Sequence, residues 1–548
     1  MMSKKFGLIA IILVILGAVF GGVFGRLPIQ SLADGSLTPE KTVADYREAL
    51  EVIDRNYAGK IDHEKISESS IQSMLWTLDP HSAFFTRGEF RKLYEDQQSQ
   101  FYGIGVSILQ HRDGVYVQSI IPNTPADKAG LRYGDRFLEI EGKDAKDYTS
   151  AEVSKNVRGE RGTTVNIKIG RAGVDKPLEF NIVRGGVPLP SIRNYFMLRD
   201  GAGYVGLNGG FQETTAQELD EAISELKKQG MKSLILDLRN NPGGLLPQAI
   251  EVVSRFVPRG QTVVSVKGRS RDAQSRELRA VGDKTQDLPL VVMINGGSAS
   301  ASEIVAGAIQ DYGRGVVVGT DSFGKGLVQR VFPLPFGTGL TLTTARYYTP
   351  YGRSLQRDYS SGSIYDYYTQ HSENDEDKAS PTPDTKPKPI GIPVKTAGGR
   401  VYNGGRGIEP DLKAPALSFT PLRYRINEAA FFFVRQLVAG QIKSFESYKI
   451  DKQNYNSRVQ ANDFQINDKL LEAFRAFVLK DKENGLSAEN LNGQIDYIKS
   501  RLREEIATAN YSSEAGQQVL LETDPQVLKA IDAVPEAKKL LGSFTVSK

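Results

Sequence analysis

The residues best suited to chemistry lie in two short stretches, one rich in serine and one with a lysine between glycines. Residues 295–304 read NGGSASASEI and place Ser300 between a buried apolar run and a predicted helix. Residues 319–326 read GTDSFGKG and contain Lys325. A serine at a helix N-terminus lies beside unpaired N–H groups, which suits a nucleophile and an oxyanion. This pair predicts nucleophilic catalysis.

Small residues surround the predicted nucleophile. Ser298 and Ser302 flank it, and alanines separate the three serines. Serine is a preferred N-cap residue, so the simplest alternative is that these side chains only cap the helix. One serine is enough for a cap, however, and small residues also let a substrate backbone approach closely. We therefore predict that Ser300 has a chemical role.

The lysine requires a special environment to act as a base. Its pKa must fall from about 10.4 towards 7–8 through burial and desolvation. Phe323 and Leu327 are apolar neighbours that could bury it, and a strand is expected over residues 327–332. Side chains alternate along a strand, so Lys325, Leu327 and Gln329 are expected on one face. The alternative is an ordinary exposed loop lysine.

The same stretch partly matches a nucleotide-binding loop. Gly319, Gly324 and Lys325 fit the P-loop spacing, but Gly326 occupies the position of the Ser or Thr that binds Mg²⁺. A P-loop also leads into a helix, whereas a strand is expected here. Both differences remove parts that nucleotide binding needs.

Composition excludes several other kinds of site. The 548 residues correspond to roughly three to four domains. The net charge of +4 is too small to indicate a nucleic-acid surface, and the chain has no cysteine. Its four histidines are scattered, so a zinc site is not expected. We expect no metal and no cofactor.

The N-terminus is predicted to be a membrane segment. Residues 6–25 read FGLIAIILVILGAVFGGVFG, a run without charge that would span roughly 30 Å as a helix. Lys4 and Lys5 precede it, which favours a cytoplasmic tail and export of the rest. A cleaved signal peptide is the alternative, although the apolar run is long for one and lacks an A-x-A site. Either way the bulk of the chain is expected on the extracytoplasmic side, in a bacterial periplasm.

The hydrophobic pattern changes several times along the chain. Helical spacing is followed by short β-runs with glycine turns, then by alternating buried strands and helices, and finally by helical stripes. A polar, proline-rich linker interrupts the α/β part. The predicted regions are a membrane anchor or signal over 1–26, a helical region over 38–100, a β-domain over 101–186, an α/β core over 187–415 with the linker at 366–390, and a helical domain over 418–548.

Several stretches together closely resemble the carboxyl-terminal processing, or tail-specific, proteases. They are spread from about residue 40 to 415 in the order found in that family. The stretches are LDPHSAFF (78–85), LDLRNNPGG (236–244), GGSASASEIVAGAIQD (296–311), GTDSFGKGLVQ (319–329), LTTARYYTPYGRSLQ (342–356) and GRGIEPD (405–411).

The resemblance implies a serine–lysine protease. Ser300 would be the nucleophile and Lys325 its base, and Gln329 would orient the lysine. The oxyanion hole would be formed by the backbone N–H groups of Gly244 and Ala301. Glycine suits this task because it allows backbone donors to approach a substrate closely.

A second resemblance concerns the β-domain. The sequence from Phe101 onward is similar to a PDZ domain, whose carboxylate-binding loop would be Gly103, Ile104, Gly105 and Val106. Such domains add the C-terminal tail of a peptide as an extra strand and hold its carboxylate with backbone N–H groups. Residues 150–157 would form the helix beside this groove. Taken alone, the glycines could equally serve an ordinary β-turn.

The expected protein is therefore multidomain, with mixed α/β and α+β content. It would combine an N-terminal transmembrane helix, a helical N-terminal segment, a PDZ β-domain, an α/β serine–lysine protease core and a helical C-terminal region. We expect a serine endopeptidase that cleaves exported proteins near apolar C-terminal tails. A non-catalytic PDZ scaffold and the P-loop protein are the alternatives. The C-terminal helices leave self-association or a regulatory protein open as partners, and nucleic acid is not expected.

Overall fold

The structure is a computed structural model that describes residues 38–97, 100–269, 275–360, 367, 391–396, 399–455 and 458–544. The predicted membrane segment at 6–25 lies outside these residues, and so does the predicted linker at 366–390 apart from Tyr367. Within the described ranges, every helix is too short or too polar to cross a bilayer.

The chain divides into two compact units, residues 1–70 and 71–548. In the first unit, α2 (Pro39–Asn56) begins at the N-cap Thr38, whose hydroxyl accepts a hydrogen bond from Lys41 N. None of its residues is buried, and its apolar side chains Val43, Tyr46 and Ile53 are exposed. The helix α3 (His63–Trp76) runs across the boundary between the units.

The α/β core is built on a mostly parallel sheet in the order β10-β11-β12-β15-β16-β21. Only β10 of these described strands runs antiparallel to its neighbour. The strands are β10 (Ile192–Met197), β11 (Ala202–Leu207), β12 (Ser233–Asp237), β15 (Leu290–Ile294), β16 (Val316–Gly319) and β21 (Leu412–Lys413).

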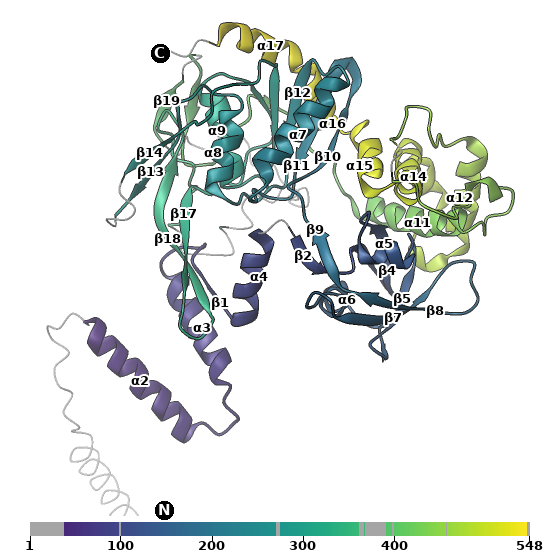
Figure 1. Cartoon of the computed structure of the whole chain (residues 1–548), viewed down its shortest axis with the longest axis horizontal. Helices are drawn as coiled ribbons and strands as arrows, with labels where there is room; N and C mark the ends of the chain where they lie inside the picture. Colours follow the sequence, from purple (N-terminus) through teal and green to yellow (C-terminus); the bar gives the residue numbers. More distant parts are fainter. Residues whose placement is uncertain are drawn as a thin grey trace, which may run out of the picture. The chain divides into compact units, whose positions relative to one another are not determined.

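Alternate side chains of these strands enter two separate cores. Leu234 and Leu236 pack with α7 (Thr215–Lys228), α8 (Leu246–Ser254) and α9 (Ala301–Asp311). Ile235, between them, packs on the other face with α16 (Pro525–Asp532) and α17 (Val534–Ser543). A parallel sheet needs cover on both faces, and here the last helices of the chain provide the second cover (Figure 1).

An antiparallel sheet stands beside the α/β core and carries part of the predicted site. Its order is β1-β18-β13-β14, and β17 pairs with β18. The predicted helical region over 38–100 thus also contains a strand, β1, in addition to α4 (Arg87–Gln97). The strands are β1 (Ala83–Phe85), β13 (Thr262–Gly268), β14 (Arg276–Arg279), β17 (Leu327–Pro333) and β18 (Gly339–Tyr348), and a separate hairpin is formed by β19 (Pro393–Lys395) and β20 (Val401–Asn403).

The predicted PDZ domain forms a sheet in the order β3-β4-β5-β7-β8, with β6 paired to β5. The helices α5 (Pro125–Ala129) and α6 (Ser150–Val157) enclose its core, and α6 begins with a capping box at Thr149. The strands are β3 (Val106–His111), β4 (Gly114–Ile120), β5 (Arg136–Ile140), β6 (Lys143–Asp144), β7 (Thr164–Gly170) and β8 (Leu178–Val183), and β2 (Gln100–Gly103) pairs with β9 (Gly185–Pro188).

The C-terminal helices contact the PDZ domain as well as the α/β core. Tyr116 and Tyr133 of the PDZ domain belong to the apolar core of the helical region. Tyr133 donates a hydrogen bond to Glu505, and Arg435 Nε donates to the carbonyl of Gly134 at 2.6 Å. These helices are α11 (Pro421–Val438), α12 (Asp468–Lys480), α13 (Ala488–Asn492), α14 (Ile495–Asn510) and α15 (Ser513–Leu521).

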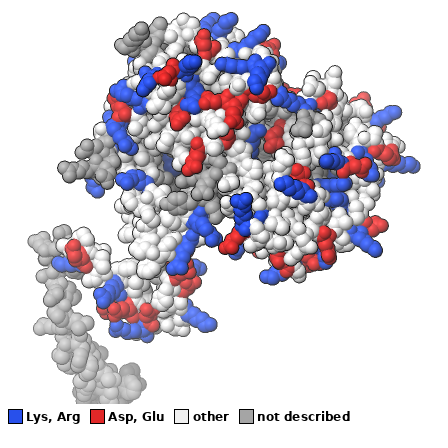
Figure 2. All heavy atoms as spheres, in the orientation of Figure 1, with Lys and Arg blue, Asp and Glu red and all other residues white. Residues whose placement is uncertain are grey.

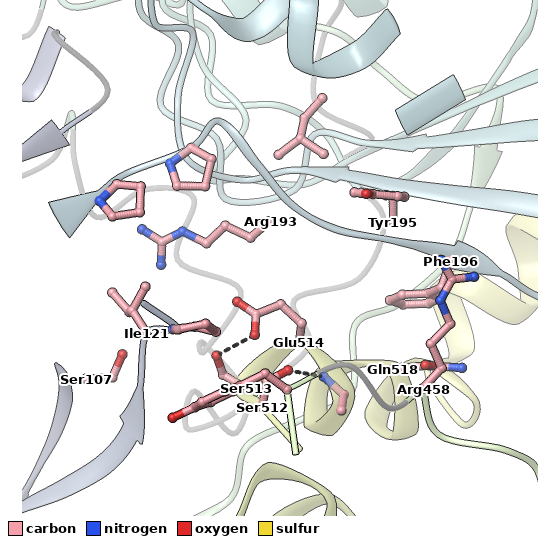
Figure 3. A pocket seen from close by; sticks show the side chains of 16 residues that line it. Ser107, Ile121, Arg193, Tyr195, Phe196, Arg458, Ser512, Ser513, Glu514 and Gln518 are labelled. Atoms are coloured by element: carbon pink, nitrogen blue, oxygen red, sulfur yellow. Dashed lines mark hydrogen bonds between the residues drawn. The ribbon is translucent and has the colours of Figure 1, made fainter. Parts of the chain in front are cut away.

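A cavity of about 390 Å³ lies where the PDZ domain, β10 and α15 meet. Figure 3 shows Ser107 of the PDZ domain, Arg193 of β10 and Gln518 of α15 around it. On the face drawn in Figure 2, basic and acidic side chains are intermixed, in keeping with the nearly balanced charge of the chain.

Candidate active site

Ser300 lies at the carboxyl edge of the parallel sheet, where β15 has ended and α9 begins. It is the N-cap of α9, with φ 54° and ψ −112°. A positive φ is costly for a residue other than glycine, and such strain is typical of functional positions. The flanking serines hold this turn: Ser298 Oγ donates to Leu238 O at 2.8 Å, and Ser302 Oγ donates to Asn241 O at 2.9 Å.

Glu303 connects the serine stretch with the lysine stretch. Its Oε2 accepts hydrogen bonds from the backbone N–H groups of Ser300 and Lys325, each at 2.8 Å. Its Oε1 accepts from Ser322 Oγ at 2.6 Å and from Gly324 N at 2.7 Å. One carboxylate therefore fixes both stretches, and it brings the backbones of the predicted nucleophile and base to the same oxygen atom.

Glu303 is a site residue that we did not predict from the sequence. Its side chain is fully buried, and burial raises the pKa of Glu303, although the Ser322 hydroxyl and three backbone amides act to lower it. A signal was present in the sequence, because Ser300 and Glu303 form the S-x-x-E pattern of a capping box. That pattern predicts the bond to Ser300 N, but not the bonds to the distant lysine stretch.

Lys325 is held by the glutamine predicted to orient it. Its Nζ donates to Gln329 Oε1 at 3.1 Å. Burial lowers the pKa of Lys325 below its usual range, while Glu303 and Asp79 act in the opposite direction. Among the described residues, no hydrogen bond joins Lys325 Nζ to Ser300 Oγ. Catalytic hydrogen bonds are often absent or long before substrate is bound.

Lys325 lies outside the strand that contains Gln329, contrary to our prediction. We expected Lys325, Leu327 and Gln329 on one face of a strand, but β17 begins only at Leu327, so Lys325 lies in the preceding loop. The pairing of β17 with β18 also shifts register between Val328 and Gln329. Lys325 and Gln329 are in contact although Lys325 precedes the strand, so strand alternation does not explain their contact.

The LDPHS turn supports Gln329 from the other side. Asp79 accepts hydrogen bonds from the backbone N–H groups of His81 and Ser82, and from Ser82 Oγ at 2.7 Å. The carbonyl of His81 in turn accepts from Gln329 Nε2. Burial is the main effect on His81 and the nearby Lys325 the second, and they lower the pKa of His81 to about 3, so its ring is neutral. The turn thus fixes which end of the Gln329 amide faces the lysine.

The NPGG loop lies directly against the predicted nucleophile. A side chain at Gly243 would meet Ser300 Cβ at 2.8 Å and Ala301 N at 3.0 Å, so only glycine fits there. Gly243 N donates to Asn241 Oδ1, and Leu245 N donates to Phe211 O at 2.7 Å. In the described part of the chain, the amides of Gly244 and Ala301 donate to no other residue. The arrangement can therefore offer two donors to an oxyanion.

The predicted carboxylate loop joins β2 to β3 of the PDZ domain. The carbonyl of Ile104 accepts from Ala126 N at 2.7 Å, and the carbonyl of Gly105 accepts from Ile121 N at 3.0 Å. Gly105 has φ +89°, and a side chain there would meet Thr124 at 2.4 Å. The loop, which also includes Gly103 and Val106, is thus fixed to the body of the domain.

The P-loop alternative fails on local structure. The residues that follow Lys325 and Gly326 form the strand β17. A phosphate-binding loop needs a helix N-terminus at this position.

Two family models match parts of the chain. A model of peptidase family S41 matches residues 201–368, and a model of the PDZ domain matches residues 103–182.

Similar proteins share more than these two matched regions. The carboxy-terminal-processing protease of Bartonella bacilliformis is 39% identical over 320 residues, which cover 58% of this chain and 73% of that protein. The carboxy-terminal processing protease CtpB of Bacillus subtilis is 33% identical over 334 residues, covering 60% and 68%. Among solved structures, a photosystem II D1 C-terminal processing protease is 30% identical with a TM-score of 0.33, covering 58% of this chain and 86% of that one.

Proposed function

Because this chain belongs to peptidase family S41, among its PDZ-containing carboxy-terminal processing proteases, and is a serine-type peptidase, we propose that it cleaves exported proteins near their C-terminal tails. The reaction would use a dyad of Ser300 and Lys325. No metal or nucleotide enters the proposed mechanism.

The observation that carries the dyad is the shared carboxylate of Glu303. The backbone N–H groups of Ser300 and Lys325 both bind its Oε2 at 2.8 Å. Lys325 is also buried and bound to Gln329, which gives the amine a fixed direction and a lowered pKa. These are the conditions under which a lysine can accept a proton near neutral pH.

The proposed mechanism follows from these positions. Neutral Lys325 takes the proton of the Ser300 hydroxyl, and the serine oxygen attacks a peptide carbonyl to form a C–O bond. The amides of Gly244 and Ala301 stabilise the oxyanion; the loss of one such donor typically lowers the rate ~10²–10³-fold. Lys325 then protonates the leaving amine as the C–N bond breaks, and water releases the acyl group from Ser300.

Substrate selection and location complete the proposal. The PDZ domain would bind a mostly apolar C-terminal tail as an added strand, with the tail carboxylate on the loop from Gly103 to Val106. The segment at 6–25 would keep the enzyme at a membrane, with the folded parts on the extracytoplasmic side, in a bacterial periplasm.

The experiment that tests the function compares wild type with Ser300→Ala. A serine-reactive probe is expected to label the wild-type peptide that contains Ser300, and exported proteins from cells with the variant are expected to keep longer C-termini by mass spectrometry. Ser360→Ala, an exposed serine, serves as the control and should behave as wild type. Cleavage by the Ser300→Ala protein at the wild-type rate would refute the assignment.

The PDZ loop gives a matched pair of glycine variants. Gly105→Ala is expected to weaken binding of an apolar tail peptide about 10-fold or more, because its Cβ would lie 2.4 Å from Thr124 and displace the loop. Gly142→Ala is the control: it has a similar positive φ of +71°, but its Cβ would meet nothing within 4 Å. Fluorescence anisotropy with a labelled peptide measures both. Equal affinities for the two variants would show that the tail binds elsewhere.

A further inference from the structure

Arg239 lies at the point where the parallel sheet gives way to the NPGG loop. It is the second residue after β12 ends at Asp237, and one residue separates it from Asn241. Its Nε is 3.0 Å from both carboxylate oxygens of Asp237, and its Nη2 is 2.7 Å from Oδ2. Tyr204 donates a further hydrogen bond to the same carboxylate at 2.8 Å. The sheet itself thus holds one side of the guanidinium.

The other side is held by the C-terminal region. Arg239 Nη1 donates to Asp524 Oδ2 and to Gln526 Oε1, each at 2.8 Å. Asp524 is also the N-cap of α16, because its Oδ1 accepts from Gln526 N at 2.8 Å. Gln526 Nε2 donates to Ala414 O at 2.8 Å. Asp524 therefore caps α16 and binds Arg239 at the same time.

These contacts are shielded from water. The side chains of Arg239 and Asp524 are 13% and 19% exposed, and Gln526 is buried. Burial alone would lower the pKa of Arg239, but Asp237 and Asp524 raise it above its usual value. Removal of one partner from a buried, hydrogen-bonded charge cluster is far more costly than loss of an exposed pair. The C-terminal contacts are thus a firm support for Arg239.

The backbone continues from Arg239 directly into the NPGG loop (residues 241–244), which is the oxyanion loop of the proposed mechanism. Its carbonyl accepts from Asn208 Nδ2 at 3.0 Å, and Asn240 follows with a left-handed φ of 59°. The carbonyl of Asn241 then accepts from Ala299 N at 3.0 Å, next to the nucleophile. A shift of Arg239 would therefore move the start of the loop that presents Gly244.

We propose that Asp524 and Gln526 are positioning residues of the proteolytic site, which set the oxyanion loop through Arg239. This inference rests on the proposed function. It gives the last helices of the chain a part in the reaction besides covering the sheet. An oxyanion donor acts mainly in the transition state, so a displaced donor lowers kcat and leaves KM nearly unchanged.

The test uses variants of Asp524 in the full chain. Asp524→Ser keeps a good N-cap for α16 but is too short to reach Arg239, whereas Asp524→Asn keeps both the cap and an uncharged acceptor. A misplacement of about 1 Å can cost ~10²-fold, so we expect kcat to fall about 10- to 100-fold in the serine variant. KM should change less than about twofold, and the asparagine variant should recover part of the loss.

A control and a second measurement separate this role from general stability. Glu522 lies two residues before Asp524 and pairs with Arg503, not with Arg239. Glu522→Gln removes that ion pair alone, so its kcat should equal that of wild type. Hydrogen exchange of a peptide covering 238–245 should be faster in Asp524→Ser and unchanged in Glu522→Gln. Wild-type kcat and wild-type exchange in Asp524→Ser would overturn the inference. If wild type itself does not cleave, the proposed function fails, and hydrogen exchange alone decides whether Asp524 positions the loop.

Discussion

Replacement of Lys325 by arginine is expected to lower kcat for a tailed substrate by about 10³-fold or more, with the fold retained. General base catalysis contributes ~10²–10⁴-fold, and arginine cannot lose its proton in a protein. Lys325→Met is the second variant, because methionine fits an apolar environment without providing a base. Steady-state kinetics and thermal unfolding measure the two effects separately.

The control for this prediction is Lys284→Arg, an exposed lysine in the same domain, which should keep wild-type kcat. The pH dependence of wild type gives an independent check. Burial lowers the pKa of Lys325, and in the proposed mechanism the neutral amine is the active form. kcat/KM should therefore rise with pH and level off, and the midpoint of this rise should lie below 10.5. Near-normal turnover by Lys325→Arg, or a midpoint at the ordinary lysine value, would show that another group is the base.

The elements around the site could be predicted from sequence because their signals are local. Residues 290–294 are all apolar and form β15, and residues 215–228, whose apolar side chains recur at helical spacing, form α7. Asp followed by Pro is a typical helix start, and α16 begins at Pro525 with Asp524 as its N-cap. Each of these signals depends on residues a few positions apart, and side-chain periodicity and capping are properties of that range.

The support of the site could not be predicted in the same way, because its contacts join distant residues. Gln329 is oriented by the carbonyl of His81, and Arg239 is held by Asp524; both partners lie more than 200 residues away in sequence. No periodicity connects such pairs. The sheet topology brings them together, and a local pattern can even mislead, as it did for the expected common face of Lys325 and Gln329.

Glu303→Gln is expected to damage both activity and stability, because all four neighbours of this carboxylate are donors. Ser300 N, Lys325 N, Gly324 N and Ser322 Oγ each donate to it. An amide in its place would turn one oxygen into an NH₂ group that faces two donors. Each buried polar group left unpaired costs about 1–3 kcal/mol, so the free energy of unfolding should fall by about 2–5 kcal/mol. Chemical denaturation measures this loss.

The effect on catalysis should exceed what the stability loss explains. Glu303 touches no substrate in the proposed mechanism, but the backbones of Ser300 and Lys325 share its Oε2, so separation of the two stretches should lower kcat by about 10²-fold. Ser322→Ala is the graded comparison: it removes one donor to the carboxylate and leaves the three amides bound, but it also removes the acceptor of the buried Ile408 N–H. It should therefore lose about 1–3 kcal/mol of stability and much less activity than Glu303→Gln. If Glu303→Gln were as active as Ser322→Ala at a temperature where both are folded, the carboxylate would serve the fold alone. The meeting of nucleophile and base would then depend on the substrate.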